Sequence, residues 1–571
     1  MDIITGKGTK IIITQKLLIF NTQFVQIKKG SAEMLKKLFK ITMLIIVSIL
    51  LIAGIEVFTT PINAFAINKT YYVDSVKGSD SNNGTSSNTP WASLTKVNSK
   101  IYSEGDKILF KAGGIWTGQL YAKGSGINGA PIVIDMYGTG NKPIIQGNGT
   151  KHNTIYFYNQ SYWEINNLEV TNKASDYGDY RGISVNGDDY GVINHIYIKN
   201  CDIHDVNGEV RWISGSKADE NGIYYGTGWD ASKRTGGIVF DMQNTSTTHV
   251  KTTFNDILVQ GCKIKDCSFG GIIVKQIDNG TSWGVRKSAG DSNWTPHTNV
   301  TIKDNYISQY GSDHACNGIY MTDVKGGTIK NNVVAGAGTC GIEMYYCDSI
   351  TCEKNETFDT TQKAGGADSN GIDPDKGTTN IIVQNNYVHD NGDGILLCEF
   401  GFGSSTIRYN ILQNNKKLAL NLHSDSKATA DIYNNILYTN IASSELVNSS
   451  GGQTTMNKGT YKIRNNIFYS AVSGPAISTG TKVTYDYNCY YGVSAPSSDG
   501  HAIIADPQLV KPGSGKDGGP VGTAFSSLSG YKLKSTSPCI NKGISIWSGG
   551  KDFWGNTLYN SSADIGANEY R

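Results

Sequence analysis

The stretch Gly371-Ile372-Asp373-Pro374-Asp375-Lys376 is one copy of a short unit that recurs along much of the chain. Each copy starts with Gly-Ile, and the third residue after the glycine is apolar in every copy. The copies that align on their glycine are residues 237–241, 271–275, 318–322, 341–345, 371–375 and 394–398.

A second marker, an asparagine set between apolar residues, follows most copies of the first. Where its spacing is tightest, it recurs every 22 to 25 residues. A period of this size, built from short β-type runs and Gly/Asn turns, predicts a solenoid whose coils are stable because they stack. Stacked asparagines can hydrogen-bond one another and the turn backbone. We place in this column Asn167, Asn200, Asn305, Asn332, Asn355, Asn386, Asn410, Asn435, Asn466 and Asn488, with Gly261 standing in once.

The alignment assigns the two faces of the repeated strand. Strand side chains alternate, so the first and third residues after glycine share one face, and these are nearly all apolar. We expect that face to point into the coil and the second and fourth residues to form an outer wall. Along the wall the pairs are Val239/Asp241, Ile273/Lys275, Tyr320/Thr322, Glu343/Tyr345, Asp373/Asp375 and Leu396/Cys398.

The composition fits a turn-rich β protein. The 571 residues include 67 Gly and 32 Tyr but only 12 Pro, and 51 basic residues balance 49 acidic ones for a net charge of +2. Nothing in this balance indicates a nucleic-acid partner. We expect a monomer that binds a polysaccharide, without nucleic acid and, once a signal peptide is cleaved, without a membrane.

The N-terminal region predicts secretion. A basic stretch opens at Met34, an apolar run covers residues 41–58, and Ala64-Phe65-Ala66 is a small-x-small cleavage site, so residues 34–66 form a signal peptide. The apolar run is also about long enough to span a bilayer, so an uncleaved anchor is the alternative. Residues 1–33 lack signal-peptide features and are interpreted as a start codon assigned too early or as a cytoplasmic tail.

The ten cysteines would ordinarily indicate disulfides in a secreted chain. Cys201 and Cys262, however, each follow a column position directly, which predicts buried apolar packing. Among Cys340, Cys347 and Cys352 one pair could bridge. The chain has no CxxC pair, which argues against a zinc knuckle.

Both ends of residues 67–571 resemble a known superfamily. The N-terminal motifs are Tyr71-Tyr72-Val73-Asp74, then GSDSNNGT, PWASL and GDKILFKAGG. A short helix is expected near Ser93. The C-terminal motif is Asp564-Ile565-Gly566-Ala567-Asn568-Glu569-Tyr570. These motifs resemble secreted right-handed parallel β-helix proteins of the pectate-lyase-like superfamily. The resemblance implies an all-β, single-stranded solenoid of about 11 coils, with an N-terminal cap (67–100) and a loop-rich C-terminal cap (500–571). Members include polysaccharide lyases, glycoside hydrolases and uronan epimerases, so the fold alone does not select the chemistry.

Three intervals are longer than one coil and are candidates for rims beside the wall. Residues 207–236 contain Trp212 and Trp229, residues 276–299 contain Trp283, and residues 361–370 form a GGADSN loop. Loops on one face of a repeat array usually carry binding, although they can also be flaps that pack on the coil.

The wall pairs predict a cluster of carboxylates. Neighbouring coils lie about 4.8 Å apart, so Glu343 and Asp373 should be adjacent, with Asp375 about 7 Å from Asp373. Crowded carboxylates raise one pKa, which is what glycosidic cleavage needs. The first spacing fits a retaining hydrolase and the second an inverting one. We therefore take Glu343, Asp373, Asp375 and Lys376 as the candidate catalytic group. Candidate substrate-binding residues are Tyr320, Tyr345, Lys275, Glu399, His423, Trp212, Trp229 and Trp283.

Two other functions stay open. Related lyases pair a Ca²⁺ held by aspartates with a Lys or Arg base, and here Asp368, Asp390 and Asp393 could supply metal ligands, with Lys376 or Lys275 as the base. The superfamily's Asp-Asp-Gly-x-Asp calcium pattern is only half met by residues 369–373. A non-catalytic, glycan-binding adhesin is the third reading. We favour a secreted enzyme that hydrolyses a polysaccharide.

Overall fold

The computed structural model describes residues 68–208, 234–243, 250–275, 286–363, 368–448, 458–478, 482–519, 522–558 and 562–571, together with residues 40 and 42. The proposed signal peptide and the residues before it lie outside these ranges, apart from residues 40 and 42. Among the described residues, no helix is long and apolar enough to cross a membrane. Residues 68–571 form one compact unit.

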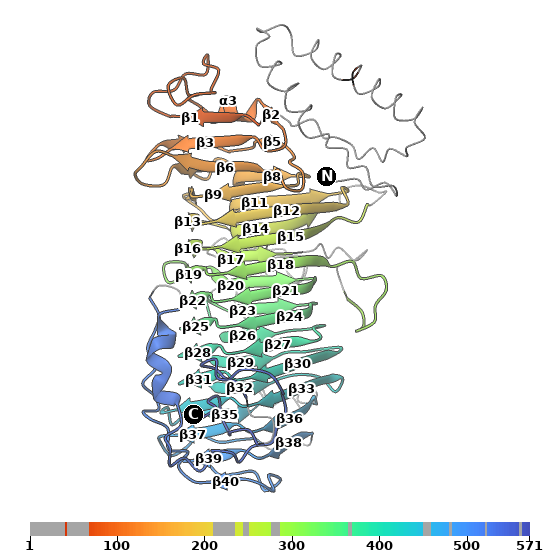
Figure 1. Ribbon diagram of the computed structural model, residues 1–571, viewed down its shortest axis with the longest axis vertical. Helices are drawn as coiled ribbons and strands as arrows, with labels where there is room; N and C mark the ends of the chain where they lie inside the picture. The colour runs from red at the N-terminus through yellow and green to blue at the C-terminus, as the bar shows by residue number, and fades with distance from the viewer. Residues whose placement is uncertain are drawn as a thin grey trace, which may run out of the picture. The chain divides into compact units, whose positions relative to one another are not determined.

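This unit is a right-handed parallel β-helix, as the sequence predicts (Figure 1). Most coils contribute one strand to each of three parallel sheets, called here sheets I, II and III, whereas the coils at the two ends have no strand in sheet III. Sheet I contains β1 (Thr70–Val73), β3 (Lys107–Lys111), β6 (Ile132–Tyr137), β9 (Trp163–Asn166), β12 (Val192–Lys199), β15 (Thr253–Gln260), β18 (His297–Lys303), β21 (Val324–Lys330), β24 (Asp348–Glu353), β27 (Ile381–Gln384), β30 (Gly403–Arg408), β33 (Ala428–Tyr433), β36 (Thr460–Arg464) and β38 (Val483–Asp486).

Sheet II follows sheet I in each coil. It contains β4 (Ile115–Thr117), β7 (Ile144–Gln146), β10 (Glu169–Asn172), β13 (Asp202–Val206), β16 (Lys263–Cys267), β19 (Tyr306–Ser308), β22 (Val333–Ala335), β25 (Glu356–Phe358), β28 (Tyr387–His389), β31 (Ile411–Gln413), β34 (Ile436–Thr439), β37 (Ile467–Ser470), β39 (Cys489–Tyr491) and β40 (Ile503–Ile504).

Sheet III carries the predicted wall on its outer face. It contains β8 (Asn153–Tyr158), β11 (Arg181–Asp188), β14 (Gly236–Gln243), β17 (Phe269–Val274), β20 (Ala315–Thr322), β23 (Cys340–Tyr345), β26 (Asn370–Pro374), β29 (Asp393–Leu397), β32 (Leu418–Leu422) and β35 (Glu445–Asn448). The apolar positions assigned to the inside of the coil, such as Ile342, Met344 and Ile372, are fully buried in one continuous core.

The glycine of each repeat lies where the chain passes close to the interior side chains of sheet II. A Cβ at Gly318 would be 2.2 Å from Val334 Cγ1, and one at Gly371 would be 2.5 Å from Val388 Cγ1. Any larger residue would displace the core, which is why glycine opens the wall strand.

The asparagine column is a buried hydrogen-bonded ladder between sheets I and II. The Nδ2 group of Asn386 donates to Asn410 Oδ1 at 3.0 Å and to the Cys352 carbonyl at 2.9 Å, while Asn386 Oδ1 accepts from Asn355. The same pattern runs from Asn305 to Asn488, where Asp499 Oδ2 accepts the last pair of bonds.

The first three members of the predicted column occupy a different position. Asn167, Asn200 and Gly261 have φ values of 55°, 54° and 67°, so they fill the left-handed turn position one residue before the ladder. The alignment was therefore off by one in these coils, because asparagine suits both positions. Cys201 and Cys262 occupy the ladder position there and are buried as expected.

The described chain ends are tied to the solenoid in different ways. At the N-terminal end, β1 pairs with β3 and the short helix α3 (Leu94–Asn98) is capped by the side chain of Ser93, as predicted. The C-terminal region, including the 3₁₀ helix η1 (Ala524–Tyr531), packs along the outer face of sheet II, where its apolar residues meet Tyr387, Ile411 and Ile436 (Figure 1). It therefore extends well back from the last coil. A two-stranded sheet pairs β2 (Ile101–Tyr102) with β5 (Lys123–Gly124).

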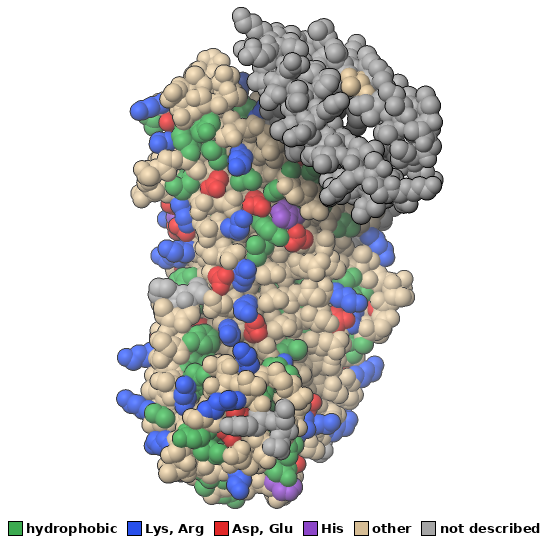
Figure 2. All heavy atoms as spheres, in the orientation of Figure 1, with side chains coloured by type: hydrophobic (Ala, Val, Ile, Leu, Met, Phe, Trp, Pro, Cys, Tyr) green, Lys and Arg blue, Asp and Glu red, His purple; other side chains and the backbone are tan. Residues whose placement is uncertain are grey.

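All ten cysteines are free thiols, so the bridge considered for Cys340, Cys347 and Cys352 is not formed. Basic and acidic side chains are interspersed over the face of the molecule shown in Figure 2.

Replacing Asn386 with alanine should destabilise the protein by about 1–3 kcal/mol, because the N–H and Nδ2 groups of Asn355 lose their shared acceptor, and Asn410 Oδ1 and the Cys352 carbonyl each lose a donor. Urea denaturation measures the change, with the exposed Asn440→Ala as the control. Equal midpoints for the two variants would contradict a stabilising role for the ladder.

Candidate active site

The structure pairs the wall residues as the alignment predicted. Tyr320 is the register partner of Glu343, and Glu343 is the register partner of Asp373, on the neighbouring strands β20, β23 and β26. Asp375 follows two residues after Asp373. Glu343, Asp373 and Asp375 are 1%, 2% and 8% exposed, so three carboxyl groups are gathered in a nearly closed part of the wall.

A column of polar residues just before four of the six repeat glycines completes the cluster, and the sequence analysis did not identify it. Asn317 Nδ2 donates to Glu343 Oε2 at 2.6 Å. Asn370 Nδ2 and the Cys340 thiol both donate to Asp373 Oδ2, at 3.3 and 3.4 Å. The signal was the run Asn317, Cys340, Asn370 and Asp393, whose members are register partners on successive strands.

This column was missed because strict alternation places it inside the coil. Asn317 lies three residues before Tyr320, which in a regular strand would put the two side chains on opposite faces. A Cβ on the intervening Gly318 would point into the core at Val334, and Ile319 also points into the core. The alternation therefore breaks at the glycine, so Asn317 and Tyr320 both lie on the wall.

Electrostatics distinguish Asp373 from its neighbours. Burial raises the pKa of its carboxyl group well above the usual value, and the nearby charges of Asp375, Glu343 and Asp368 raise it further. Its Oδ1 atom is buried without a hydrogen-bond partner. Asp373 is thus a buried carboxyl group with a raised pKa beside other acids, which is the arrangement that favours a general acid.

Asp375 and Lys376 lie at the end of the same strand. The Lys376 backbone N–H donates to Asp375 Oδ1 at 2.6 Å, and the Lys376 ammonium group lies 5.5 Å from the centre of the Tyr346 ring. The thiol of Cys398 is held protonated because burial, followed by the charges of Asp375, Asp373 and Asp368, raises its pKa. Asp368, expected as a metal ligand, is therefore an electrostatic neighbour of this cluster.

The two tyrosines expected to contact sugar are buried instead. Tyr320 and Tyr345 are 1% and 6% exposed and pack in an apolar cluster on the wall. Lys275 is also buried, at 2% exposed. In this structure these three side chains support the wall and do not present a surface to a ligand. The cluster consists of Val239, Phe269, Ile273, Cys316, Tyr320, Tyr345 and Tyr346.

Arg286, in the segment after β17, contacts residues of later coils. The Arg286 guanidinium group donates to Thr379 Oγ1 at 2.6 Å, pairs with Asp348 at 3.2 Å and stacks on Trp294 at 4.7 Å from the ring centre. Trp212, Trp229 and Trp283 lie outside the described residues, so their proposed sugar contacts stay predictions.

Glu399 and His423 lie beyond Asp375 at the bend of the next coils. Glu399 is fully buried and accepts a hydrogen bond from Ser405 Oγ at 2.5 Å. Burial raises the pKa of its carboxyl group to about 8. The His423 ring packs edge-on against Phe400, at 5.5 Å between ring centres. Because Glu399 is fully buried, its carboxyl group is not accessible to a ligand in this structure.

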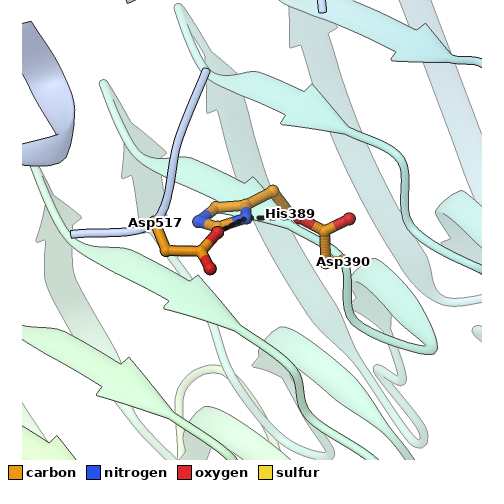
Figure 3. A group of neighbouring side chains, drawn as sticks. All are labelled: His389, Asp390 and Asp517. Atoms are coloured by element: carbon orange, nitrogen blue, oxygen red, sulfur yellow. Dashed lines mark hydrogen bonds and ion pairs between the residues drawn. The ribbon is translucent and has the colours of Figure 1, made fainter. Parts of the chain in front are cut away.

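The three aspartates proposed as calcium ligands are not brought together. Asp393 accepts from Asn421 Nδ2 at 2.9 Å on the wall, and Asp368 neighbours Asp373. Asp390 instead lies on sheet II beside His389 and Asp517 (Figure 3). Asp390 and Asp393 are close in the sequence, but the coil places them on different sheets.

Comparison with known proteins agrees with the fold and points to glycan chemistry. Residues 284–504 match a family model described as "Right handed beta helix region". The chain is 27% identical over 629 residues to a lacto-N-biosidase of Bifidobacterium longum subsp. longum, covering 88% of this chain and 36% of that protein. The chain therefore spans about a third of the length of this curated relative.

Two solved structures of a GH136 lacto-N-biosidase from Eubacterium ramulus share the fold. The native protein is 21% identical with a TM-score of 0.54, and its selenomethionine derivative is 22% identical with a TM-score of 0.53. Each match covers 72% of this chain and 68% of the other. The right-handed parallel β-helix that the sequence predicts is thus confirmed.

Asp373→Asn should make the protein more stable than the wild type at pH 7. A carboxyl group whose pKa is raised by folding costs stability as the pH rises above its unfolded value of about 3.9, and the amide has no such cost. The gain should therefore shrink as the pH falls toward about 4. Urea midpoints at the two pH values test this, with the exposed Asp176→Asn as the control. A gain that is absent at pH 7 would contradict the assignment.

Proposed function

We propose that the chain is a glycoside hydrolase that cleaves a glycosidic bond at the wall cluster of Glu343, Asp373 and Asp375. The observation that carries the proposal is the buried Asp373 carboxyl group with its raised pKa, one coil from Glu343 and two residues from Asp375. The similarity to lacto-N-biosidases supports the same reaction class.

Asp373 would donate its proton to the oxygen of the leaving sugar. Hydrolysis also needs a second, ionised carboxylate, which either attacks the anomeric carbon or activates a water molecule. Asp375 and Glu343 are the two candidates for this role. The strand spacing of about 4.8 Å favours a retaining route through Glu343, and the spacing of about 7 Å along the strand favours an inverting route through Asp375.

For the substrate we propose a glycan that ends in lacto-N-biose, on the basis of the activity named for the relatives. The pattern of residues 34–66 supports secretion, so the enzyme would meet this glycan outside the cell.

The described geometry supports hydrolysis over a calcium-dependent lyase reaction. The proposed ligands Asp368, Asp390 and Asp393 do not converge, and Lys275, one of the two candidate bases, is buried. A lyase would release an unsaturated sugar that absorbs near the ultraviolet edge and would lose activity with a calcium chelator. Hydrolysis produces reducing ends without that absorbance.

Asp373→Asn should lower kcat on an unactivated oligosaccharide that ends in lacto-N-biose by at least about 100-fold, because the leaving sugar loses its proton donor. Chromatography of the released lacto-N-biose measures the rate, and Asp176→Asn is the control. Rates equal to wild type would remove this cluster from the mechanism.

The partner carboxylate can be identified in the same assay. Glu343→Gln and Asp375→Asn are made singly, and the variant that loses more activity identifies the partner. Proton NMR of the first-formed anomer should then show retention if Glu343 is essential and inversion if Asp375 is. The opposite pairing of variant and stereochemistry would contradict the spacing argument.

A further inference from the structure

The outer side of sheet II carries two copies of one arrangement that the proposed hydrolysis does not use. In each copy a histidine lies between the aspartate that follows it and a glutamate on the preceding coil. In the first, His204 Nδ1 is 2.7 Å from Asp205 Oδ2 and Nε2 is 3.2 Å from Glu169 Oε1. The second, formed by Glu356, His389 and Asp390, has the corresponding distances of 3.1 Å to glutamate and 2.7 Å to aspartate.

The two copies differ in the charge that approaches them. Near the first, Lys173 Nζ lies 3.9 Å from Asp205 Oδ1, so a cation balances the acids. Near the second, a third acid approaches: Asp517 Oδ1 lies 3.7 Å from His389 Nδ1 (Figure 3). Asp517 belongs to the C-terminal region, which reaches sheet II from far along the chain.

The second copy has an excess of negative charge, part of which is buried. Glu356 and His389 are fully buried, and within the described ranges neither Lys nor Arg forms an ion pair with Glu356, Asp390 or Asp517. Three carboxylates would thus outnumber even a protonated imidazole. Grouped carboxylates without a countercharge are costly, and the cost is greatest where they are buried.

Two buried polar atoms at the same place also have no hydrogen-bond partner. One is Glu356 Oε2 and the other is the phenol oxygen of Tyr387, whose ring stacks on His389 at 4.0 Å between ring centres. The site is therefore an acidic cluster whose buried polar atoms and charges are not all balanced by the protein.

We propose that His389, Asp390 and Asp517 bind a divalent transition-metal cation such as Zn²⁺. One ligand atom from each residue lies within 4.8 Å of the others, which lets a single ion reach all three. Glu356 would accept the Nε2 proton and leave the Nδ1 lone pair directed at the metal, the usual role of a carboxylate behind a histidine ligand. An imidazole with two carboxylates suits Zn²⁺ better than the oxygen-preferring Ca²⁺ or Mg²⁺.

The location indicates a structural role. Asp517 has a side chain that is 64% exposed, so an ion can enter from solvent. Next to it, the Gly518 N–H donates to Glu356 Oε1 at 2.5 Å, and Gln413 Nε2 donates to the Gly515 carbonyl at 3.3 Å. The cation would fasten this C-terminal segment to the coils that contain β25 and β28.

The test uses the full protein without a histidine tag, after EDTA treatment and dialysis. Calorimetric titration with Zn²⁺ should show one site, and Zn²⁺ should raise the Tm, since a ligand that binds only the folded state stabilises it. Asp517→Asn should weaken binding at least about tenfold and remove most of the Tm rise. His389→Gln should do the same.

Asp205→Asn is the control at the other copy, because Asp205 is the counterpart of Asp390 and lies beside Lys173; Zn²⁺ binding should not change. Absence of Zn²⁺ binding in the wild type would overturn the proposal, as would equal affinity in Asp517→Asn. Asp517 is exposed, so its variant should fold even if His389→Gln does not. These readouts are independent of glycan cleavage, so failure of the hydrolase proposal would leave them intact.

Discussion

The structure depends on the stacking of each coil on the next in fixed register. Parallel backbone pairing sets the spacing, and the asparagine ladder from Asn305 to Asn488 supplies buried hydrogen bonds at the turn between sheets I and II. A slip of one residue would send every interior side chain to the wall. The register is therefore what brings Glu343 and Asp373, thirty residues apart in the sequence (373 − 343), onto adjacent positions.

The repeat pattern was sufficient to predict the solenoid, its interior face and the pairing of Glu343 with Asp373. These follow from periodicity, which is a local property of the sequence. The polar column before the glycines was not predicted, because it requires a break in strand alternation at residues such as Gly318. The pattern identifies the glycine. Only the close approach of Val334 to Gly318 explains why Asn317 and Tyr320 both lie on the wall.

Contacts between distant segments explain the remaining differences. Tyr320 and Tyr345 were expected at a sugar-binding surface, but they pack in an apolar cluster on the wall. Arg286 shows the same kind of long-range constraint, because its partners Asp348 and Thr379 lie on later coils. Asp517 meets His389 only because the C-terminal region runs back along sheet II, and no periodicity specifies that path.

The two proposals place different chemistry on two sheets of one scaffold. On sheet III, burial and neighbouring carboxylates raise the pKa of Asp373. On sheet II, the carboxylates around His389 would be stabilised by a bound cation. The central claim is that glycan cleavage takes place at the wall. A crystal structure of Asp373→Asn with an intact lacto-N-biose-terminated oligosaccharide tests it most directly. The account predicts the scissile oxygen within hydrogen-bonding distance of residue 373, with Asp375 or Glu343 facing the anomeric carbon. A sugar bound on another sheet, with the wall cluster empty, would contradict it.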